Sequence, residues 1–133
     1  SGIVDFVSIG TNDLSQDLFG VDRNSPAEPE LLDHWQPRLM QLIGRVATAS
    51  RNASIDCSVC GSAASDPTFA VVLAGLGVGS VSSAPAAVAS VRASLMSFEP
   101  VVAAEAAVLA AGAPTNVAAR LAVKAFLTQS SAR

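Results

Sequence analysis

The sequence has little charge and few side chains that bind soft metals. Only 14% of its 133 residues are charged, and it contains two cysteines, one histidine and no tyrosine. The basic residues stand singly along the chain, and the formal net charge is −3. Because proteins that bind a nucleic-acid backbone cluster their basic side chains, we expect no nucleic-acid partner. With 50% hydrophobic residues, the chain is predicted to bury one core.

The sequence also lacks an uninterrupted apolar run of the length that crosses a membrane. Residues 67–91 contain no charge, but three glycines and Pro85 interrupt any helix there. The start of the chain carries an acidic residue, Asp5, and turns polar after Ile9, which is unlike a secretory signal. We therefore expect no membrane association and a cytoplasmic location.

Three short segments have the composition of buried strands. Residues 3–9, 55–59 and 78–82 are rich in β-branched or aromatic residues and are bounded by turn-forming residues. Such short apolar runs are typical of strands that are covered by helices. We therefore expect three strands, each followed by a helical segment.

Helical patterns lie between and after these segments. Apolar residues from Leu32 to Val46 recur three and four apart, which predicts one long amphipathic helix that starts behind Pro26 and Pro29. Asp66 is predicted to cap the next helix, and Gly77 to end it. Three further helices are expected, over residues 88–98, 101–111 and 115–128.

The alternation of strands and helices predicts an α/β fold with parallel strands. In such folds the functional residues gather where the strands end, at their carboxyl edge. Here the strand ends would bring "GTND" (10–13), "CGSAAS" (60–65) and "SAP" (83–85) to one rim. The sequence therefore predicts a site built from small, polar and thiol-bearing residues at this rim.

The two cysteines of "CSVCG" are predicted to have different roles. Cys57 and Cys60 would lie on opposite faces of a strand and about 10 Å apart, which is too far for a disulfide. We expect no zinc site at these cysteines because there is no second cysteine pair, and His34 is expected in a helix. We therefore expect Cys57 to pack in the core and Cys60 to present its thiol at the rim, unless Cys60 is also an ordinary small packing residue.

The stretch "GTNDLSQDL" (10–18) has two interpretations. It is either a glycine turn and loop whose Asn12 and Asp13 satisfy backbone donors, or part of a binding site. With Arg23 and the thiol of Cys60, these residues could hold a metal ion, an anion and a proton donor. Those are the requirements of a phosphorylated carboxylate substrate.

Three longer strings resemble one family of enzymes. They are "DFVSIGTNDLSQDLFGVDRNSP", "SVCGSAASDP" and "LAGLGVGSVSSAPAAVASVRASL", and the similarity extends over about residues 3–98. They are similar to the C-terminal part of the phosphoenolpyruvate (PEP) binding barrel of enzyme I of the bacterial phosphotransferase system. Two strings, "GVDRNSP" and "LLDHWQPRLMQLI", favour enzyme I over PEP synthase and pyruvate phosphate dikinase, which remain the alternatives.

The resemblance implies a role for each of four residues. Asp13 matches a ligand of Mg²⁺, Asn12 matches a residue that hydrogen-bonds PEP, and Arg23 matches an arginine that clamps the phosphate. Cys60 matches the thiol that protonates the enolate left after phosphoryl transfer, which gives pyruvate, or removes that proton in reverse. The implied activity is transfer of the phosphoryl group from PEP to a protein histidine.

The resemblance also implies an incomplete architecture. Residues 1–98 would form the last three βα units of a TIM (βα)₈ barrel, and residues 99–133 an alanine-rich helical extension. The acceptor histidine of the family lies on a separate N-terminal domain, which exchanges the phosphoryl group with a phosphocarrier protein, and His34 does not match it. We therefore expect a fragment that is inactive alone. Its open strand edges and one apolar sheet face would favour self-association, with a homodimer as the expected form.

Three positions differ from the pattern of the family. Asp17 stands where a tyrosine is usual, Gln36 where a histidine is usual, and Ser62 where a glutamate follows the Cys-Gly pair. Asp17 would add negative charge near an anion site, and Ser62 removes a carboxylate. These differences leave open a third hypothesis, a non-catalytic module of the family that serves dimerisation.

Overall fold

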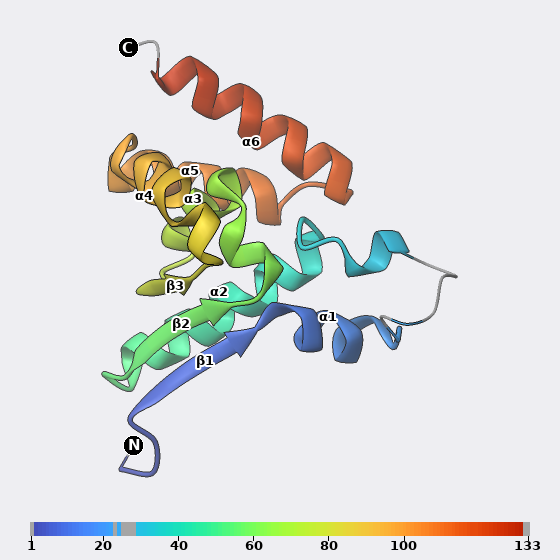
Figure 1. Cartoon of the computed structure of the whole chain (residues 1–133), viewed down its shortest axis with the longest axis vertical. Coiled ribbons are helices and arrows are strands. Elements are labelled where there is room, and N and C mark those ends of the chain that lie inside the picture. The colour runs from blue at the N-terminus through green and yellow to red at the C-terminus, as the bar shows by residue number, and fades with distance from the viewer. Residues whose placement is uncertain (1, 23, 25–28, 132–133) are drawn as a thin grey trace.

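The computed structural model describes residues 2–22, 24 and 29–131 (Figure 1). Within this part the chain forms one parallel sheet in the order β1, β2, β3. The strands are β1 (Phe6–Gly10), β2 (Asp56–Cys60) and β3 (Ser80–Ser82). Gly10 pairs with Cys60, and Cys60 with Ser82, so the three strands end at one level. The predicted α/β class, the three strands and their parallel direction are confirmed.

Helices connect and follow the strands. The described α-helices are α1 (Thr11–Phe19), α2 (Pro37–Asn52), α3 (Pro67–Gly75), α4 (Val88–Met96), α5 (Pro100–Ala111) and α6 (Asn116–Ser131). Short 3₁₀ turns are η1 (Pro29–Leu32), η2 (Ser62–Ser65) and η3 (Pro85–Ala87). The helices predicted after Asp66 and over the C-terminal third are confirmed within a few residues of their predicted bounds.

Helix α1 was not expected, because residues 10–18 read as a turn and loop. The segment is helical from Thr11 to Phe19 and ends at Gly20, which has a φ of 66°. Asp13 lies in the first turn, where a carboxylate interacts favourably with the helix dipole. Buried Thr11 and Ser15 tie one side of the helix to the rest of the protein. Packing of this short polar helix outweighs its weak sequence pattern.

The long helix begins later than predicted. It was expected from about residue 32, but α2 starts at Pro37, and the preceding residue Gln36 has an extended backbone with ψ of 122°. A proline disfavours the helical conformation of the residue before it, so the helix cannot extend back through Gln36. His34 therefore lies in a turn, and its predicted placement in a helix is wrong.

The core lies on one face of the sheet. Ile9, Cys57 and Val59 are at most 6% exposed and belong to the same apolar cluster as the buried residues of α2. The opposite face was expected to be apolar, and this is wrong for most of it. That face carries Phe6, which is 65% exposed, but otherwise polar or small side chains: Ser8, Asp56, Ser58, Cys60, Ser80 and Ser82. The reason is the strand alternation, which sends every apolar residue except Phe6 to the covered face.

The C-terminal helices pack on α3. A Cβ atom at Gly75 would collide with the backbone carbonyl of Ala103, so the glycine lets α5 approach the backbone of α3. Buried alanines of α5 form the rest of this contact, and α6 packs on α5 (Figure 1). The residues after position 99 are thus joined to the helix that follows the "CGSAAS" segment.

No single helix in the described part of the chain is long and apolar enough to cross a membrane. The residues from Pro85 to Met96 and from Pro100 to Ala111 reach that length and composition only as a pair, and the pair is bent by 107°.

Candidate functional site

The ends of β1 and β2 carry three of the predicted site residues, which are Asn12, Asp13 and Cys60. Gly10 ends β1 and precedes α1, so Asn12 and Asp13 lie in the first turn of that helix. Cys60 ends β2 directly beside Gly10. Gly10, the N-cap residue, has no side chain and makes no side-chain capping bond to the helix. The positive end of the α1 dipole therefore faces the rim uncapped.

Contacts between the two strand ends fix their relative position. The hydroxyl of Thr11, which is 1% exposed, donates a hydrogen bond to the backbone carbonyl of Cys60 at 3.2 Å. Gly61 follows with a φ of 104°, and a Cβ there would lie 2.9 Å from Thr11 Oγ1 and 3.7 Å from Asn12 Nδ2. Only glycine adopts this conformation easily and leaves room for both neighbours.

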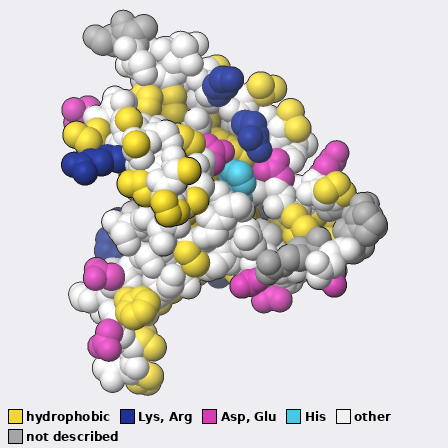
Figure 2. Space-filling model, viewed as in Figure 1, with side chains coloured by type: hydrophobic (Ala, Val, Ile, Leu, Met, Phe, Trp, Pro, Cys, Tyr) yellow, Lys and Arg dark blue, Asp and Glu magenta, His cyan; other side chains and the backbone are white. Residues whose placement is uncertain are grey.

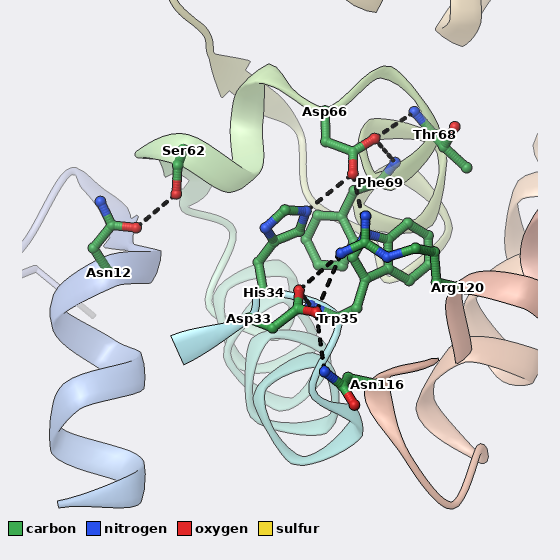
Figure 3. Close-up of polar contacts among 10 residues, drawn as sticks. All are labelled: Asn12, Asp33, His34, Trp35, Ser62, Asp66, Thr68, Phe69, Asn116 and Arg120. Atoms are coloured by element: carbon green, nitrogen blue, oxygen red, sulfur yellow. Dashed lines mark hydrogen bonds and ion pairs between the residues drawn. The ribbon is translucent and has the colours of Figure 1, made fainter. Parts of the chain in front are cut away.

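Ser62 makes a direct contact with Asn12 (Figure 3). Its hydroxyl donates to Asn12 Oδ1 at 2.8 Å. Both side chains are exposed, and the bond connects the first turn of α1 with the turn that follows β2. Ser62 departs from the family pattern, but no local sequence pattern indicates that it contacts Asn12.

The two cysteines are free thiols on opposite faces of β2. Cys57 is 5% exposed and belongs to the core, as predicted. Cys60 is partly exposed, and the hydroxyl of Ser8 on β1 lies 3.9 Å from its sulfur. The thiol of Cys60 is thus presented on the open side of the sheet. Its role in proton transfer stays a prediction.

Of the residues predicted to bind the metal ion and the phosphate, the structure describes Asp13 but not Arg23. Asp13 is exposed, and the amide of Gln16 donates to its Oδ1 at 3.4 Å. Across the described ranges no group of three or more histidine, cysteine, aspartate or glutamate side chains could hold a metal ion. Asp13 therefore offers one carboxylate at the rim. Arg23, the predicted phosphate clamp, lies outside the described residues.

The other two departures from the family pattern lie apart from these contacts. Asp17 is exposed on α1. Gln36 precedes α2, and its side-chain amide donates to the backbone carbonyl of Glu30 at 2.9 Å. Neither residue has a hydrogen bond to Asn12, Asp13 or Cys60 among the described contacts.

A second polar cluster, which the sequence did not reveal, surrounds Asp66 (Figure 3). One carboxylate oxygen of Asp66 accepts from the backbone N–H groups of Thr68 and Phe69 at 3.0 and 3.1 Å, which caps α3 as predicted. The other oxygen accepts from His34 Nε2 and Trp35 Nε1, both at 3.0 Å. The side chain of Trp35 is fully enclosed, and its ring packs edge-on against Phe69.

These hydrogen bonds keep Asp66 ionised. Burial of the carboxyl group opposes ionisation, but the hydrogen bonds from His34, Phe69 and Trp35 outweigh it and lower the pKa of Asp66 to about 2. A group with such a pKa is negative at every pH at which the folded protein is normally studied. The negative charge is thus part of the cap of α3.

Asp33 extends this cluster to the C-terminal helix α6. Its carboxylate accepts from Asn116 Nδ2 at 3.0 Å and forms an ion pair with Arg120 at 3.0 Å. The guanidinium of Arg120 lies 5.4 Å from the centre of the Trp35 ring. Burial raises the pKa of Asp33, and bonds from Trp35 N–H, Asn116 and Arg120 lower it by more. In Figure 2 the single histidine reaches the surface beside acidic and basic side chains.

A wide groove lies elsewhere. It has a volume of about 1090 Å³ and runs between α2 and α5. Arg45, Arg51 and Val108 are among its lining residues, whereas Asn12, Asp13 and Cys60 are not. The rim combines an uncapped helix start, a carboxylate, an amide and a thiol.

Comparison with known proteins gives consistent similarities. The family model of the PEP-utilising enzyme, PEP-binding domain, matches residues 2–99. The chain is 43% identical over 125 residues to a phosphoenolpyruvate-protein phosphotransferase of Streptomyces coelicolor, a match that covers 94% of this chain. It is 39% identical over 89 residues to the phosphoenolpyruvate synthase of Pyrococcus furiosus, and 42% identical over 92 residues to a multiphosphoryl transfer protein of Rhodobacter capsulatus.

These relatives are much longer than the chain. It spans 22% of the length of the Streptomyces protein and 11% of each of the other two. The Streptomyces match extends past residue 99 into the C-terminal helices, whereas the matches to the other two cover 67% and 69% of the chain.

Proposed function

Because the chain belongs to the family of PEP-utilising enzymes, whose PEP-binding domain it matches, we propose that it forms part of the PEP site of a PEP-dependent protein phosphotransferase. The enzyme would transfer the phosphoryl group of PEP to a protein histidine and release pyruvate. The observation that carries the proposal is the rim, where Asn12 and Asp13 start an uncapped helix beside the thiol of Cys60. A phosphorylated carboxylate, a divalent cation and a proton donor can meet there.

PEP would bind through its negative charge at the start of α1. The first-turn N–H groups and the dipole of a helix favour anions, and no N-cap side chain competes for them here. Asn12 would donate a hydrogen bond to a carboxylate or phosphate oxygen of PEP. Arg23 would clamp the phosphate with its guanidinium group, which matches a phosphate in a bidentate manner.

The residues present fit a magnesium ion only in part. Mg²⁺ is usually held by one or two carboxylates together with phosphate oxygens and water, and Asp13 offers one such carboxylate. Asp13 would therefore supply one ligand, PEP would supply others, and the remaining protein ligands would come from outside these 133 residues. Bound Mg²⁺ would offset the negative charge that develops during phosphoryl transfer.

Cys60 would transfer the proton to the enolate and, in reverse, take it from pyruvate. When the phosphoryl group passes to the nitrogen of the acceptor histidine, the bond between phosphorus and the enol oxygen breaks and leaves the enolate of pyruvate. The Cys60 thiol would give its proton to the terminal carbon of this enolate and become a thiolate. In the reverse direction the thiolate would remove a methyl proton from pyruvate. The partly exposed position of Cys60 on the open side of the sheet supports this role.

The wider architecture follows from the same proposal. Residues 1–98 would supply the last three βα units of a TIM (βα)₈ barrel, and residues 99–133 a helical extension. The acceptor histidine would lie on a separate domain that serves a phosphocarrier protein of sugar transport. The assembled enzyme would be a homodimer in the cytoplasm. The parallel strands with level carboxyl ends support the barrel.

Two other functions compete with this proposal. PEP synthesis would use the same rim, and the match to a PEP synthase fits it. The phosphotransferase is favoured because its match includes the C-terminal helices. The second alternative is a non-catalytic module of the family. The three departures from the family pattern at Asp17, Gln36 and Ser62 are the reason to consider it.

A hybrid protein tests the proposal. The matched segment of the Streptomyces coelicolor phosphotransferase would be replaced by this chain, and transfer of phosphate from PEP and Mg²⁺ to protein histidine would be measured. We expect transfer in the hybrid and none with the 133 residues alone. A folded hybrid that binds no PEP would contradict the proposal, and turnover by the isolated chain would contradict the need for further residues.

The role of Cys60 is tested in the same hybrid. Cys60→Ala is expected to retain PEP binding and to lose pyruvate release. Cys57→Ala is the matched control, because Cys57 packs in the core of the same strand and should leave the reaction steps intact. Loss of PEP binding in Cys60→Ala, with the fold preserved, would assign Cys60 to substrate binding and not to proton transfer.

A further inference from the structure

We propose that Ser62 is a positioning residue that orients the carboxamide of Asn12 toward PEP. This inference rests on the proposed function, since it concerns the same rim. It assigns a role to a serine that stands where the family pattern has a glutamate. The observation that carries it is the hydrogen bond from Ser62 Oγ to Asn12 Oδ1 at 2.8 Å.

The direction of this hydrogen bond decides what Asn12 can offer to a ligand. A carboxamide has one acceptor oxygen and one donor NH₂ group, which lie in one plane on opposite sides of the bond to the side chain. Because the Ser62 hydroxyl donates to the oxygen, Nδ2 is turned away from Ser62, and it has no acceptor in the described part of the chain. The oxygens of PEP can accept but not donate, so only this orientation of Asn12 is useful. In the observed orientation Ser62 holds the Asn12 oxygen and leaves Nδ2 for an acceptor on the ligand.

The surrounding backbone holds the two residues at this distance. Thr11 precedes Asn12 and is bonded to the carbonyl of Cys60, two residues before Ser62. Gly61 allows the close approach, since a Cβ there would press against the Thr11 hydroxyl and touch the Asn12 amide. Three consecutive residues of one segment thus contact two consecutive residues of the other. The Asn12–Ser62 bond is therefore formed between anchored segments, and little conformational entropy is lost to make it.

The same contacts link the donor amide to the proposed proton donor. Ser62 and Cys60 belong to one short segment, so the bond to Asn12 also fixes the separation of the Asn12 amide and the Cys60 thiol. Figure 3 shows Asn12 and Ser62 facing one another, on the side of the view away from the cluster around Asp66. We therefore expect Ser62 to affect how PEP is bound and not to affect the stability of the core.

Nuclear magnetic resonance of the complete 133-residue chain tests the orientation directly. The side-chain NH₂ signals of Asn12, assigned by their loss in Asn12→Ala, report whether the carboxamide is fixed. In Ser62→Ala these signals should move toward the averaged positions of a mobile asparagine, and Ser62→Thr should restore them. Ser65→Ala is the matched control, because Ser65 lies in the same turn but accepts from the N–H of Ala84 at 2.9 Å. Unchanged Asn12 signals in Ser62→Ala would overturn the proposal.

Titration of the same chain and of the hybrid with PEP and MgCl₂ gives the second readout. Loss of one oriented hydrogen bond in Ser62→Ala should weaken PEP binding by about fivefold. Ser62→Thr should bind like the parent. Equal PEP affinity of the parent and Ser62→Ala would overturn the proposal.

The two readouts separate this inference from the proposed function. If the parent binds no PEP in either protein, the proposed function fails, and the Asn12 signals still decide whether Ser62 fixes the amide. If the parent binds PEP and Ser62→Ala is unchanged in signals and affinity, the positioning role fails while the proposed function stands.

Discussion

Helices α1 and α3 both begin at the same edge of the sheet, but only α3 has a side-chain N-cap. Helix α1 begins after Gly10, which offers no cap. Helix α3 begins after Asp66, whose carboxylate accepts from two backbone N–H groups of the helix and from the side chains of His34 and Trp35. The start of α1 has no side-chain cap at Gly10, and the start of α3 is capped by Asp66.

The difference shows how one topology can serve both binding and stability. Each βα unit brings the positive end of a helix to the rim, where N–H groups need an acceptor. At α3 the acceptor is Asp66, and its partners reach α6 through Asp33 and Arg120. At α1 the acceptor would be a ligand. We therefore expect changes around Asp66 to alter the free energy of unfolding, and changes around Gly10 to alter ligand affinity.

Trp35→Ala should have the largest effect on this comparison. Trp35 is 1% exposed, packs on Phe69 and donates to Asp66, so its removal leaves a cavity and takes one of two side-chain hydrogen bonds from the Asp66 carboxylate oxygen. We expect the free energy of unfolding to fall by about 3–5 kcal/mol in urea titrations. Val108→Ala, at a side chain that is 73% exposed, is the control and should change it by less than about 0.5 kcal/mol. A loss no larger than that of the control would refute the structural role of this cluster.

Acid should remove the contribution of Asp66. Its pKa is lowered from 3.8 to about 2 in the folded chain, so the charge stabilises the fold above pH 3.8. This contribution, on the order of 2 kcal/mol, is lost as the pH falls toward 2. Asp66→Asn cannot titrate there. The difference in unfolding free energy between the parent and Asp66→Asn should therefore shrink between pH 4 and 2, whereas a constant difference would show that Asp66 has an ordinary pKa.

Arg120→Ala should have a smaller effect. Arg120 pairs with Asp33 and lies over the Trp35 ring, but its side chain is 48% exposed, so water and salt weaken both contacts. We expect a loss of about 1 kcal/mol that decreases at high salt. Lys124→Ala, on the next turn of α6, serves as the control and should cost less. Equal losses in the two variants would mean that the contact with Asp33 does not hold α6 in place.

Gly10→Ser should have the smallest effect on stability and a clear effect on binding. Gly10 has an ordinary φ of −81°, and a Cβ there meets only Asp13 Oδ2 at 3.6 Å, so a serine fits. Its hydroxyl would cap α1 and change the unfolding free energy by only a few tenths of a kcal/mol. PEP affinity should fall by about tenfold, because the hydroxyl competes for the first-turn N–H groups. Gly10→Ala adds the same Cβ without the acceptor, and binding as weak as in Gly10→Ser would point to steric exclusion instead.

Part of the site was predictable from residue types alone. The strand pattern and the turn residues after each strand placed Asn12, Asp13 and Cys60 at one edge, and the alternation of the strand separated Cys57 from Cys60. These predictions rely on local periodicity, which depends only on residues that follow one another in the chain. The helix over Thr11–Phe19 was not predicted, because the glycine and polar residues at the start of the segment are also typical of a turn and loop.

The sequence by itself determined the parallel α/β order, the cap of α3 by Asp66 and the likeness to PEP-utilising enzymes, because each depends on residues that are near one another in the chain. Only the tertiary structure decided which distant groups meet: Ser62 with Asn12, Trp35 and His34 with Asp66, and Arg120 with Asp33. Such pairs lie 31 to 87 residues apart. They form when helices and strands pack, so no local pattern specifies them.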